Sequence, residues 1–250
     1  MSQFPTEYTL PYLVTSYDAD LNRNLRLSAL LRIQQEAGEQ HLRAGGLSYG
    51  TLYDMGFIFV LTRTHLVVRQ LPKFGDPPVS CLTWSNGAAG SQFTRSYVLS
   101  DSDGHVLTEG CSAFALMDAA TYRLLRPSAL GETLDALPHW PDRVSCPPPT
   151  KLKSPDPATF TPAGMRPVRH SDIDYNHHLN NTNYADFLFD FYPGGAERLL
   201  PRECTIQFSG QALLGDTIEI GTAMGDGGVY VRGAHERGVC FTAHLTVSTL

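Results

Sequence analysis

Residues 172–179 read Asp-Ile-Asp-Tyr-Asn-His-His-Leu, and residues 18–25 read Asp-Ala-Asp-Leu-Asn-Arg-Asn-Leu. Asp, Asp, Asn and Leu occupy the same positions in both stretches, and an apolar pattern of near-helical spacing follows each. Two further matches come in the same order, Gly75-Asp76 with Gly215-Asp216 and residues 104–108 with 238–242. Three matches in one order indicate a duplicated unit, of which the second copy is the shorter.

The first copy has the pattern of one long helix beside several strands. β-Formers fill residues 8–17, and a helical repeat of leucines then begins at Leu27 and should end at Gly45-Gly46. Ser28 is placed to cap this helix. Alternating or β-branched stretches follow at residues 57–70, 78–85, 92–100 and 106–117, with Asp103-Gly104 as a hairpin turn. We expect an antiparallel meander beside a single helix.

The second copy repeats this order after a proline-rich stretch. Residues 126–167 contain ten prolines, which lack a backbone donor and fix φ, so an extended connector is predicted. A buried helix should run from residue 182 or 183 to residue 192, because apolar side chains lie on most of its sides. Strands are expected at residues 203–211, 216–224, 229–233 and 239–248. The predicted organisation is α+β, with an N-terminal half at 1–126, a connector at 127–163 and a C-terminal half at 164–250.

Composition and charge narrow the classes of function. A chain of 250 residues with 42% hydrophobic and 18% charged residues can bury a substantial core. Its net charge of −6 disfavours a nucleic-acid ligand, because binding to phosphates takes a surplus of Lys and Arg. The sequence shows no export signal and no apolar run long enough to span a membrane, and its five scattered cysteines form no close pair. We therefore expect a cytoplasmic protein without metal or membrane insertion.

The quoted loop is crowded with polar and ionisable residues: Asp172, Asp174, Asn176, His177 and His178. In the simplest interpretation the loop is solvated and Asn180 or Asn181 caps the helix, but a cap needs only one such residue. A calcium loop starting at Asp172 would place His177 where glycine is required and Asn183 where a bidentate glutamate is required. Zinc is disfavoured because the side chains of adjacent histidines diverge and no third ligand is near.

Acyl transfer to water is the remaining interpretation of this loop. Unpaired backbone N–H groups at the start of a helix can hold the oxyanion that forms when a carbonyl is attacked. Asp174 would orient or deprotonate the water, while Asn176 and His178 would position the water and a thioester. The imidazole of His178 could also pass a proton to the leaving thiolate. No covalent nucleophile is required.

Residues 172–184, which end in Leu-Asn-Asn-Thr-Asn-Tyr184, resemble the signature of acyl-[acyl carrier protein] thioesterases. Residues 25–46, 59–63 and 82–84 of the first copy resemble the N-terminal half of that family. The resemblance implies a double hot-dog fold, in which two antiparallel sheets each wrap a central helix and join into one pseudo-dimer. It also implies hydrolysis of fatty acyl thioesters of acyl carrier protein by water, without a cofactor, by the set of Asp174, Asn176 and His178.

One position departs from the family pattern. The family usually has a glutamate, or in some plant members a cysteine at the next position, shortly before the second Gly-Asp turn. This chain has Gln211 and Ala212 there. Glutamine can hold water by hydrogen bonds but cannot accept its proton. We therefore keep Gln211 in the predicted site and expect Asp174 to act as the general base, while a non-catalytic acyl-binding protein stays an alternative.

The acyl pocket is expected in the first half, whose loop lacks the histidine. Its candidate substrate contacts are Leu27, Leu30, Leu31, Phe57 and Phe59, together with Asn181 of the second half. An ordinary core would hold the same apolar side chains. Cys111 and Cys204 are interpreted as small buried residues and not as nucleophiles.

Acyl carrier proteins are acidic, so their thioesterase should present basic residues. The candidates in or beside the connector are Arg143, Lys151, Lys153, Arg166 and Arg169, which could equally serve to solvate the connector. A thioesterase that acts on coenzyme A esters and a hydratase stay open as alternatives, although hydratases usually resemble Asp-x-Asn-Pro-Ile-His. The sequence also leaves acyl length and a homodimer open.

Overall fold

The alternating stretches of both copies form strands, and the helical stretches form helices at two corresponding places. The computed structural model describes residues 4–133 and 137–249, so residues 134–136 of the predicted connector lie outside the described residues, as do 1–3 and 250 at the ends of the predicted halves. The strands are β1 (Tyr8–Tyr12), β2 (Phe57–Val68), β3 (Val79–Ala89), β4 (Gln92–Ser100), β5 (Val106–Asp118), β6 (Leu124–Leu125), β7 (Thr161–Pro167), β8 (Leu199–Phe208), β9 (Thr217–Gly225), β10 (Gly228–His235) and β11 (Gly238–Thr249). The helices are α1 (Leu27–Ala44), α2 (Tyr49–Asp54) and α4 (Tyr184–Asp190), with 3-10 turns η1 (Pro127–Leu130), η2 (Pro157–Thr159), η3 (His170–Asp172) and η4 (Asn181–Asn183).

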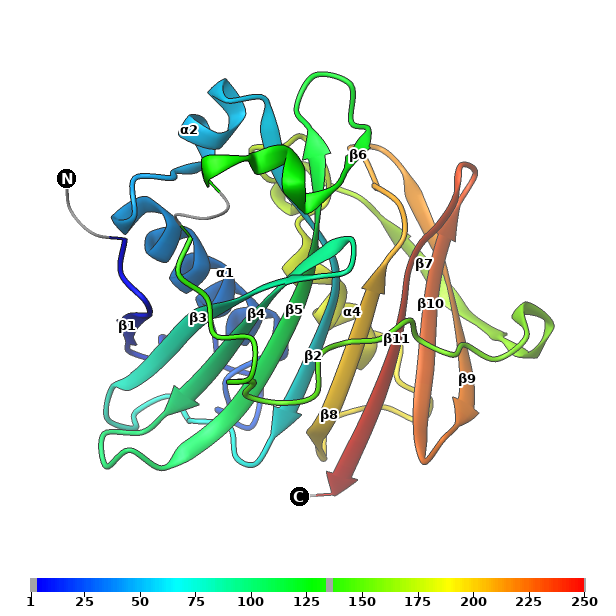
Figure 1. Cartoon of the computed structure of the whole chain (residues 1–250). Helices are drawn as coiled ribbons and strands as arrows, with labels where there is room; N and C mark the ends of the chain where they lie inside the picture. Colours follow the sequence, from blue (N-terminus) through cyan, green and yellow to red (C-terminus); the bar gives the residue numbers. More distant parts are fainter. Residues whose placement is uncertain (1–3, 134–136, 250) are drawn as a thin grey trace.

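The strands pair into one curved antiparallel sheet. Its order is β1-β3-β4-β5-β2-β8-β11-β10-β9-β7, with β6 added to β5. The two halves meet where β2 pairs with β8, from Arg63 opposite Gln207 to Val67 opposite Glu203. The strand order therefore runs in mirrored sequence on the two sides of this junction. Both α1 and α4 lie on the same side of the curved sheet (Figure 1).

The two similar loops have the same backbone conformation. Arg23 in the first loop and His177 in the second both adopt a left-handed conformation, with φ of 68° and 65°. The amide of each donates to the carbonyl three residues earlier at 3.0 Å. Farther on, the amides of Leu25 and Leu179 donate at 2.8 Å to the carbonyls of Pro72 and Ala212, just before the two Gly-Asp turns. The hydrogen bonds thus confirm the alignment of the two copies.

Helix α1 begins and ends where the helical pattern predicted, but its predicted cap is wrong. Gly45 follows its last residue, Ala44, and donates to the carbonyls of His41 and Leu42. The predicted cap at Ser28 is wrong, because Arg26 is the N-cap residue and makes no side-chain cap, while Ser28 lies buried inside the first turn. Packing of the apolar face, and not a cap, therefore decides where this helix begins. Among the described residues, no helix combines the length and apolar content needed to cross a bilayer.

Helix α4 is shorter than predicted, and four of its seven residues are buried. Asn180 accepts a hydrogen bond from the Thr182 amide at 2.9 Å and so caps the 3-10 turn before the helix. Tyr184 lies against the ring of Phe241 on β11, with centroids 4.7 Å apart, and Phe187 lies 6.2 Å from the same ring. The helix ends at Asp190 and not at residue 192, consistent with Pro193, which disfavours helical φ and ψ at the residue before it. Cys111 and Cys204 are fully buried, as expected.

The connector crosses the outer face of the sheet, opposite the helices (Figure 1). Its contacts follow the strand order: the Trp140 amide donates to Ser85 of β3, the Ser145 hydroxyl to Gly110 of β5, and the Leu152 amide to the Gln207 side chain of β8. Part of the stretch predicted as connector forms β7 at the sheet edge. Proline lacks a backbone N–H, and it is tolerated in an edge strand because the N–H groups on the outer side of that strand pair with no neighbouring strand.

Candidate active site

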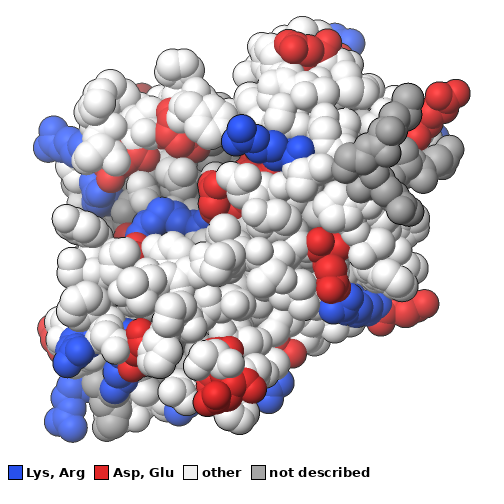
Figure 2. Space-filling model, turned by 90° about the vertical axis from the view of Figure 1, so that its left-hand side faces the viewer, with Lys and Arg blue, Asp and Glu red and all other residues white. Residues whose placement is uncertain are grey.

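A cavity of about 1120 Å³ lies between α1 and the strands β2, β4 and β5 of the first half. Much of its wall is apolar: Leu31, Ile58, Phe59, Phe93, Phe114 and Met117. The loop at residues 174–179 of the second half also lines it. Figure 2 shows that the surface is hollowed on the side of β1 and α1, with both basic and acidic side chains in the hollow. The cavity of one half is therefore open to the polar loop of the other.

The structure brings together most of the predicted site residues. Those that line the cavity are Asp174, Asn176, His178, Asn181, Gln211, Leu31 and Phe59. Leu27 and Leu30 were wrongly expected to line it: both belong to the hydrophobic core, 2% and 0% exposed, because the cavity borders α1 only from Leu31 onward. Phe57 also lies outside the cavity wall and packs against the apolar cluster that contains Phe93.

Asp174 has one oxygen engaged and one free. The Asn176 amide donates to Asp174 Oδ1 at 2.8 Å, whereas Oδ2 receives no donor from the described residues 4–133 and 137–249. The left-handed residue His177 turns the chain back, so that His178 Nδ1 lies 3.8 Å from Asp174 Oδ1. Both side chains are largely shielded, at 12% and 19% exposed. A largely shielded carboxylate with an open oxygen can accept a hydrogen bond from a water molecule.

His178 has one ring nitrogen that faces no protein partner. Its Nδ1 lies 3.3 Å from the Leu179 carbonyl and near Asp174, while Nε2 makes no hydrogen bond within the described part of the chain. An imidazole held at one nitrogen can exchange a proton at the other. The arrangement therefore leaves Nε2 available to a group bound in the cavity.

Gln211 lies beyond the end of β8, which stops at Phe208 and not at residue 211 as predicted. Its carbonyl accepts a hydrogen bond from His235 Nε2 at 2.8 Å, which holds this part of the chain. The Gln211 side chain makes no hydrogen bond to any described residue. It stays a candidate for holding water beside the loop.

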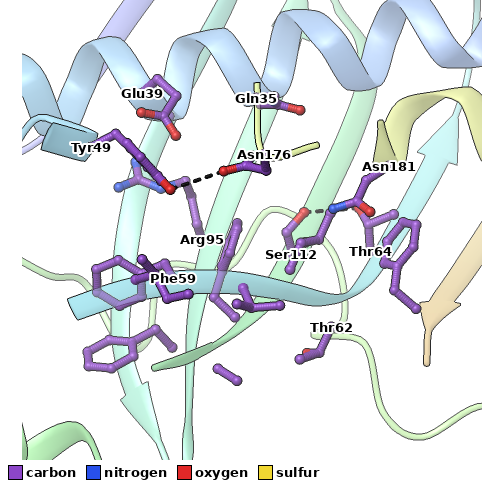
Figure 3. Close-up of a pocket in the computed structure, with 18 of the residues that line it drawn as sticks. Gln35, Glu39, Tyr49, Phe59, Thr62, Thr64, Arg95, Ser112, Asn176 and Asn181 are labelled. Carbon is purple, nitrogen blue, oxygen red and sulfur yellow. Dashed lines mark hydrogen bonds between the residues drawn. The ribbon is translucent and has the colours of Figure 1, made fainter. Parts of the chain in front are cut away.

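The first half adds polar residues that the sequence did not single out. Tyr49, at the start of α2, donates its hydroxyl hydrogen to Asn176 Oδ1 at 3.0 Å (Figure 3). Glu39 of α1 also lines the cavity, and burial, reinforced by Glu36 and opposed by Arg95, raises the pKa of its carboxyl. Tyr49 and Asn176 are 127 positions apart, so no local pattern could have paired them.

A buried arginine lies on the wall under α1. Arg95 is 8% exposed and donates to His41 Nδ1 at 2.8 Å and to Thr83 Oγ1 at 3.3 Å. His41 Nε2 lies 2.8 Å from the Pro5 carbonyl, which can only accept. His41 is therefore neutral, with its proton on Nε2, and burial together with the Arg95 charge lowers its pKa to about 4.

Comparison with known families decides the identity. The model described as "Acyl-ACP thioesterase N-terminal domain" matches residues 5–128, and "Acyl-ACP thioesterase C-terminal domain" matches residues 162–248. The chain belongs to the acyl-ACP thioesterase family. This confirms the resemblance read from the loop and from the first copy.

Curated acyl-ACP thioesterases are similar over most of the chain. The oleoyl-acyl carrier protein thioesterase 2 of Arabidopsis thaliana is 27% identical over 209 residues, which cover 74% of this chain and 54% of the relative. The dodecanoyl-[acyl-carrier-protein] hydrolase of Cinnamomum camphora is 28% identical over 196 residues, covering 73% and 50%. This chain thus spans about half the length of the curated relatives it matches.

Solved acyl-ACP thioesterases share the fold. An acyl-ACP thioesterase from Bacteroides thetaiotaomicron superposes with a TM-score of 0.84 at 18% identity, covering 99% of this chain and all of that one. The 12:0-ACP thioesterase of Umbellularia californica gives 0.84 at 21% identity, covering 98% of each chain. A large antiparallel sheet with few helices, of the hot-dog type, is therefore the fold of this family member.

The basic residues suggested for carrier docking fall into two groups. Arg143 pairs with Glu7 at 2.6 Å, and Arg166 pairs with Asp172 at 2.7 Å, where it helps to anchor the loop. The remaining candidates are Lys151, Lys153 and Arg169, which are exposed and have no ion pair in the described part of the chain. Only this second group has charge free to meet an acidic partner.

Proposed function

We propose that this chain hydrolyses fatty acyl thioesters of acyl carrier protein to the free fatty acid and the carrier thiol, with water as the nucleophile. The observation that carries the proposal is the open Oδ2 of Asp174, in a loop that lines a large, partly apolar cavity. The names of the curated relatives support the choice of carrier protein as partner.

The proposed reaction uses the two halves for different tasks. The acyl chain lies in the first-half cavity, with its thioester carbonyl beside the loop of the second half. A water molecule held by Asp174 Oδ2, with Gln211 as a second hydrogen-bonding group, attacks the carbonyl carbon and gives a proton to the carboxylate. The tetrahedral intermediate then collapses, the C–S bond breaks, and the thiolate takes a proton. His178 can pass this proton on, because its Nδ1 lies 3.8 Å from Asp174 and its Nε2 is free.

We further infer a double hot-dog architecture for the whole chain, with halves at residues 1–126 and 164–250 and a connector at 127–163. The mirrored strand order about the β2–β8 junction supports this division, as does the presence of one central helix in each half. The apolar cavity in the first half and the polar loop of the second support an acyl-binding half and a catalytic half.

Thiol release from acylated carrier protein tests the function. We expect continuous release by the unaltered chain, and release from coenzyme A esters at lower kcat/KM. A stable complex with acylated carrier and no thiol release would support the non-catalytic alternative, to which Gln211 lends support because it cannot accept a proton. A higher kcat/KM for coenzyme A esters would reassign the substrate.

A further inference from the structure

The side-chain amide of Asn176 is held by the other half of the molecule. Tyr49, in the first turn of α2, donates to Asn176 Oδ1 at 3.0 Å, and its ring meets the edge of the neighbouring Tyr175 ring with centroids 5.2 Å apart. Asn176 lines the cavity and is exposed, and its Nδ2 makes no close hydrogen bond within the described ranges, with the Tyr175 hydroxyl as a nearby polar neighbour. Because the amide is planar, holding its oxygen fixes the direction of its NH₂ group.

The corresponding loop of the first half makes the opposite contact. Asn22 occupies the position of Asn176, and its Nδ2 donates at 2.7 Å to the carbonyl of Glu197, in the segment that follows α4. Each loop therefore reaches the segment after the helix of the other half. A backbone carbonyl holds the NH₂ group of Asn22, whereas a tyrosine hydroxyl holds the oxygen of Asn176 and leaves its NH₂ group free.

We propose that Tyr49 is a positioning residue for thioester hydrolysis, which keeps the NH₂ group of Asn176 directed to the thioester carbonyl oxygen. This inference rests on the proposed function of the loop. Without the tyrosine hydroxyl the amide can turn over and present its oxygen, and two acceptors would then face each other. Loss of a donor to an oxyanion costs about 10²–10³-fold in kcat. Loss of its orientation alone should cost less.

The test compares Tyr49 with a tyrosine outside the cavity. Tyr17 is 86% exposed, does not line the cavity, and its hydroxyl makes no hydrogen bond in the described part of the chain. We expect Tyr49→Phe to lower kcat by about tenfold with KM within about twofold, as for a partial loss of one oxyanion donor. Tyr17→Phe should change neither constant by more than about twofold. Matching thermal unfolding midpoints would show that both variants are folded.

A second comparison separates positioning from a merely local effect. In an Asn176→Ala background, Tyr49→Phe should have no further effect on kcat, because the group that it orients is gone. Equal kcat values for Tyr49→Phe and Tyr17→Phe would overturn the inference, as would a rise in KM at unchanged kcat or the same loss with and without Asn176. All three results presuppose thiol release by the unaltered chain. Absence of that release would instead contradict the proposed function.

Discussion

The loops at residues 18–25 and 172–179 share one backbone, yet only the second has an open carboxylate. In the first, Asp20 Oδ1 accepts from the backbone amides of Asn22 and Asn24 at 2.8 Å each, and Oδ2 lies 3.4 Å from the side-chain Nδ2 of Asn24. In the second, Asp174 accepts only from the Asn176 amide among the described residues. Asn24 contacts the second oxygen of Asp20, whereas His178, at the corresponding position, leaves the second oxygen of Asp174 available. The same turn therefore closes the carboxylate in one copy and leaves one of its oxygens open in the other.

The helices of the two halves also differ, both in length and in what they pack against. Helix α1 has 18 residues and borders a cavity, whereas α4 has 7 residues and packs against the aromatic ring of Phe241. Gly38 of α1 lines the cavity, and its lack of a side chain leaves space there, since an added Cβ would lie 3.3 Å from the Tyr97 hydroxyl. In the proposed reaction, the filled half would support the loop at residues 172–179, and the hollow half would hold the acyl chain.

The largest expected effect separates the two aspartates. Asp174→Asn keeps the size of the side chain but removes the base, so kcat for thiol release should fall by about 10³-fold. The matched Asp20→Asn variant should keep kcat within about twofold and instead lower the free energy of unfolding by about 1.5 kcal/mol, because a charged acceptor of backbone amides is lost. Steady-state kinetics and urea unfolding of both variants check this. Similar kcat losses in the two would contradict a division between a reactive and a structural copy.

A buried histidine should make the first half sensitive to acid. The pKa of His41 is about 4 in the folded chain, against 6.5 for the free group, so between these pH values only the unfolded state takes up the proton. His41 therefore does not lower the free energy of unfolding above about pH 6.5. As the pH falls from there to about 4, protonation of the unfolded state lowers that free energy by up to about 3 kcal/mol.

Urea unfolding across this pH range measures the effect. His41→Asn keeps one donor and one acceptor for Pro5 and Arg95 and should flatten the profile between pH 4 and 6.5. A profile of unchanged slope would show that His41 is not the group that titrates.

Filling each half tests the difference in packing. Ala115 on β5 lines the cavity, whereas Ala243 on the corresponding strand β11 is fully buried in the core. Ala243→Phe should lower the free energy of unfolding by about 2 kcal/mol through overpacking. Ala115→Phe should leave stability nearly unchanged and shift selectivity toward shorter acyl chains. A panel of acyl lengths in the thiol assay, with thermal unfolding of both variants, would show this, and an unchanged length preference would place the acyl chain elsewhere.

The smallest expected effect concerns the connector that joins the halves. Replacing Lys151, Lys153 and Arg169 by Glu should lower kcat/KM for carrier-bound substrate by about tenfold and leave that for coenzyme A esters unchanged, because only the carrier is an acidic protein. Arg143→Gln is the control, since Arg143 is already paired with Glu7. Equal losses on both substrates would remove the docking role.

Sequence reasoning recovered the duplication, most strands and the family, because each depends on short-range patterns. The turn at Asp103-Gly104 and the end of α1 at Gly45 follow directly from local backbone preferences. Leu27 and Leu30 were misplaced because an apolar residue on a helix looks the same whether it faces a core or a cavity. β7 was missed because its prolines are typical of a connector. It is a strand only because it pairs with β9, which lies about fifty residues later in the chain.

The sequence by itself determined that this chain is a duplicated α+β unit with a dense polar loop before its second helix, because periodicity and turn chemistry act over a few residues. Only the tertiary structure decided which residues face the cavity, that Asp174 keeps a free oxygen, and that Tyr49 holds Asn176 from the other half. Those features depend on the pairing of β2 with β8, which brings together groups more than a hundred residues apart. Contacts of that range leave no periodic signal in the chain.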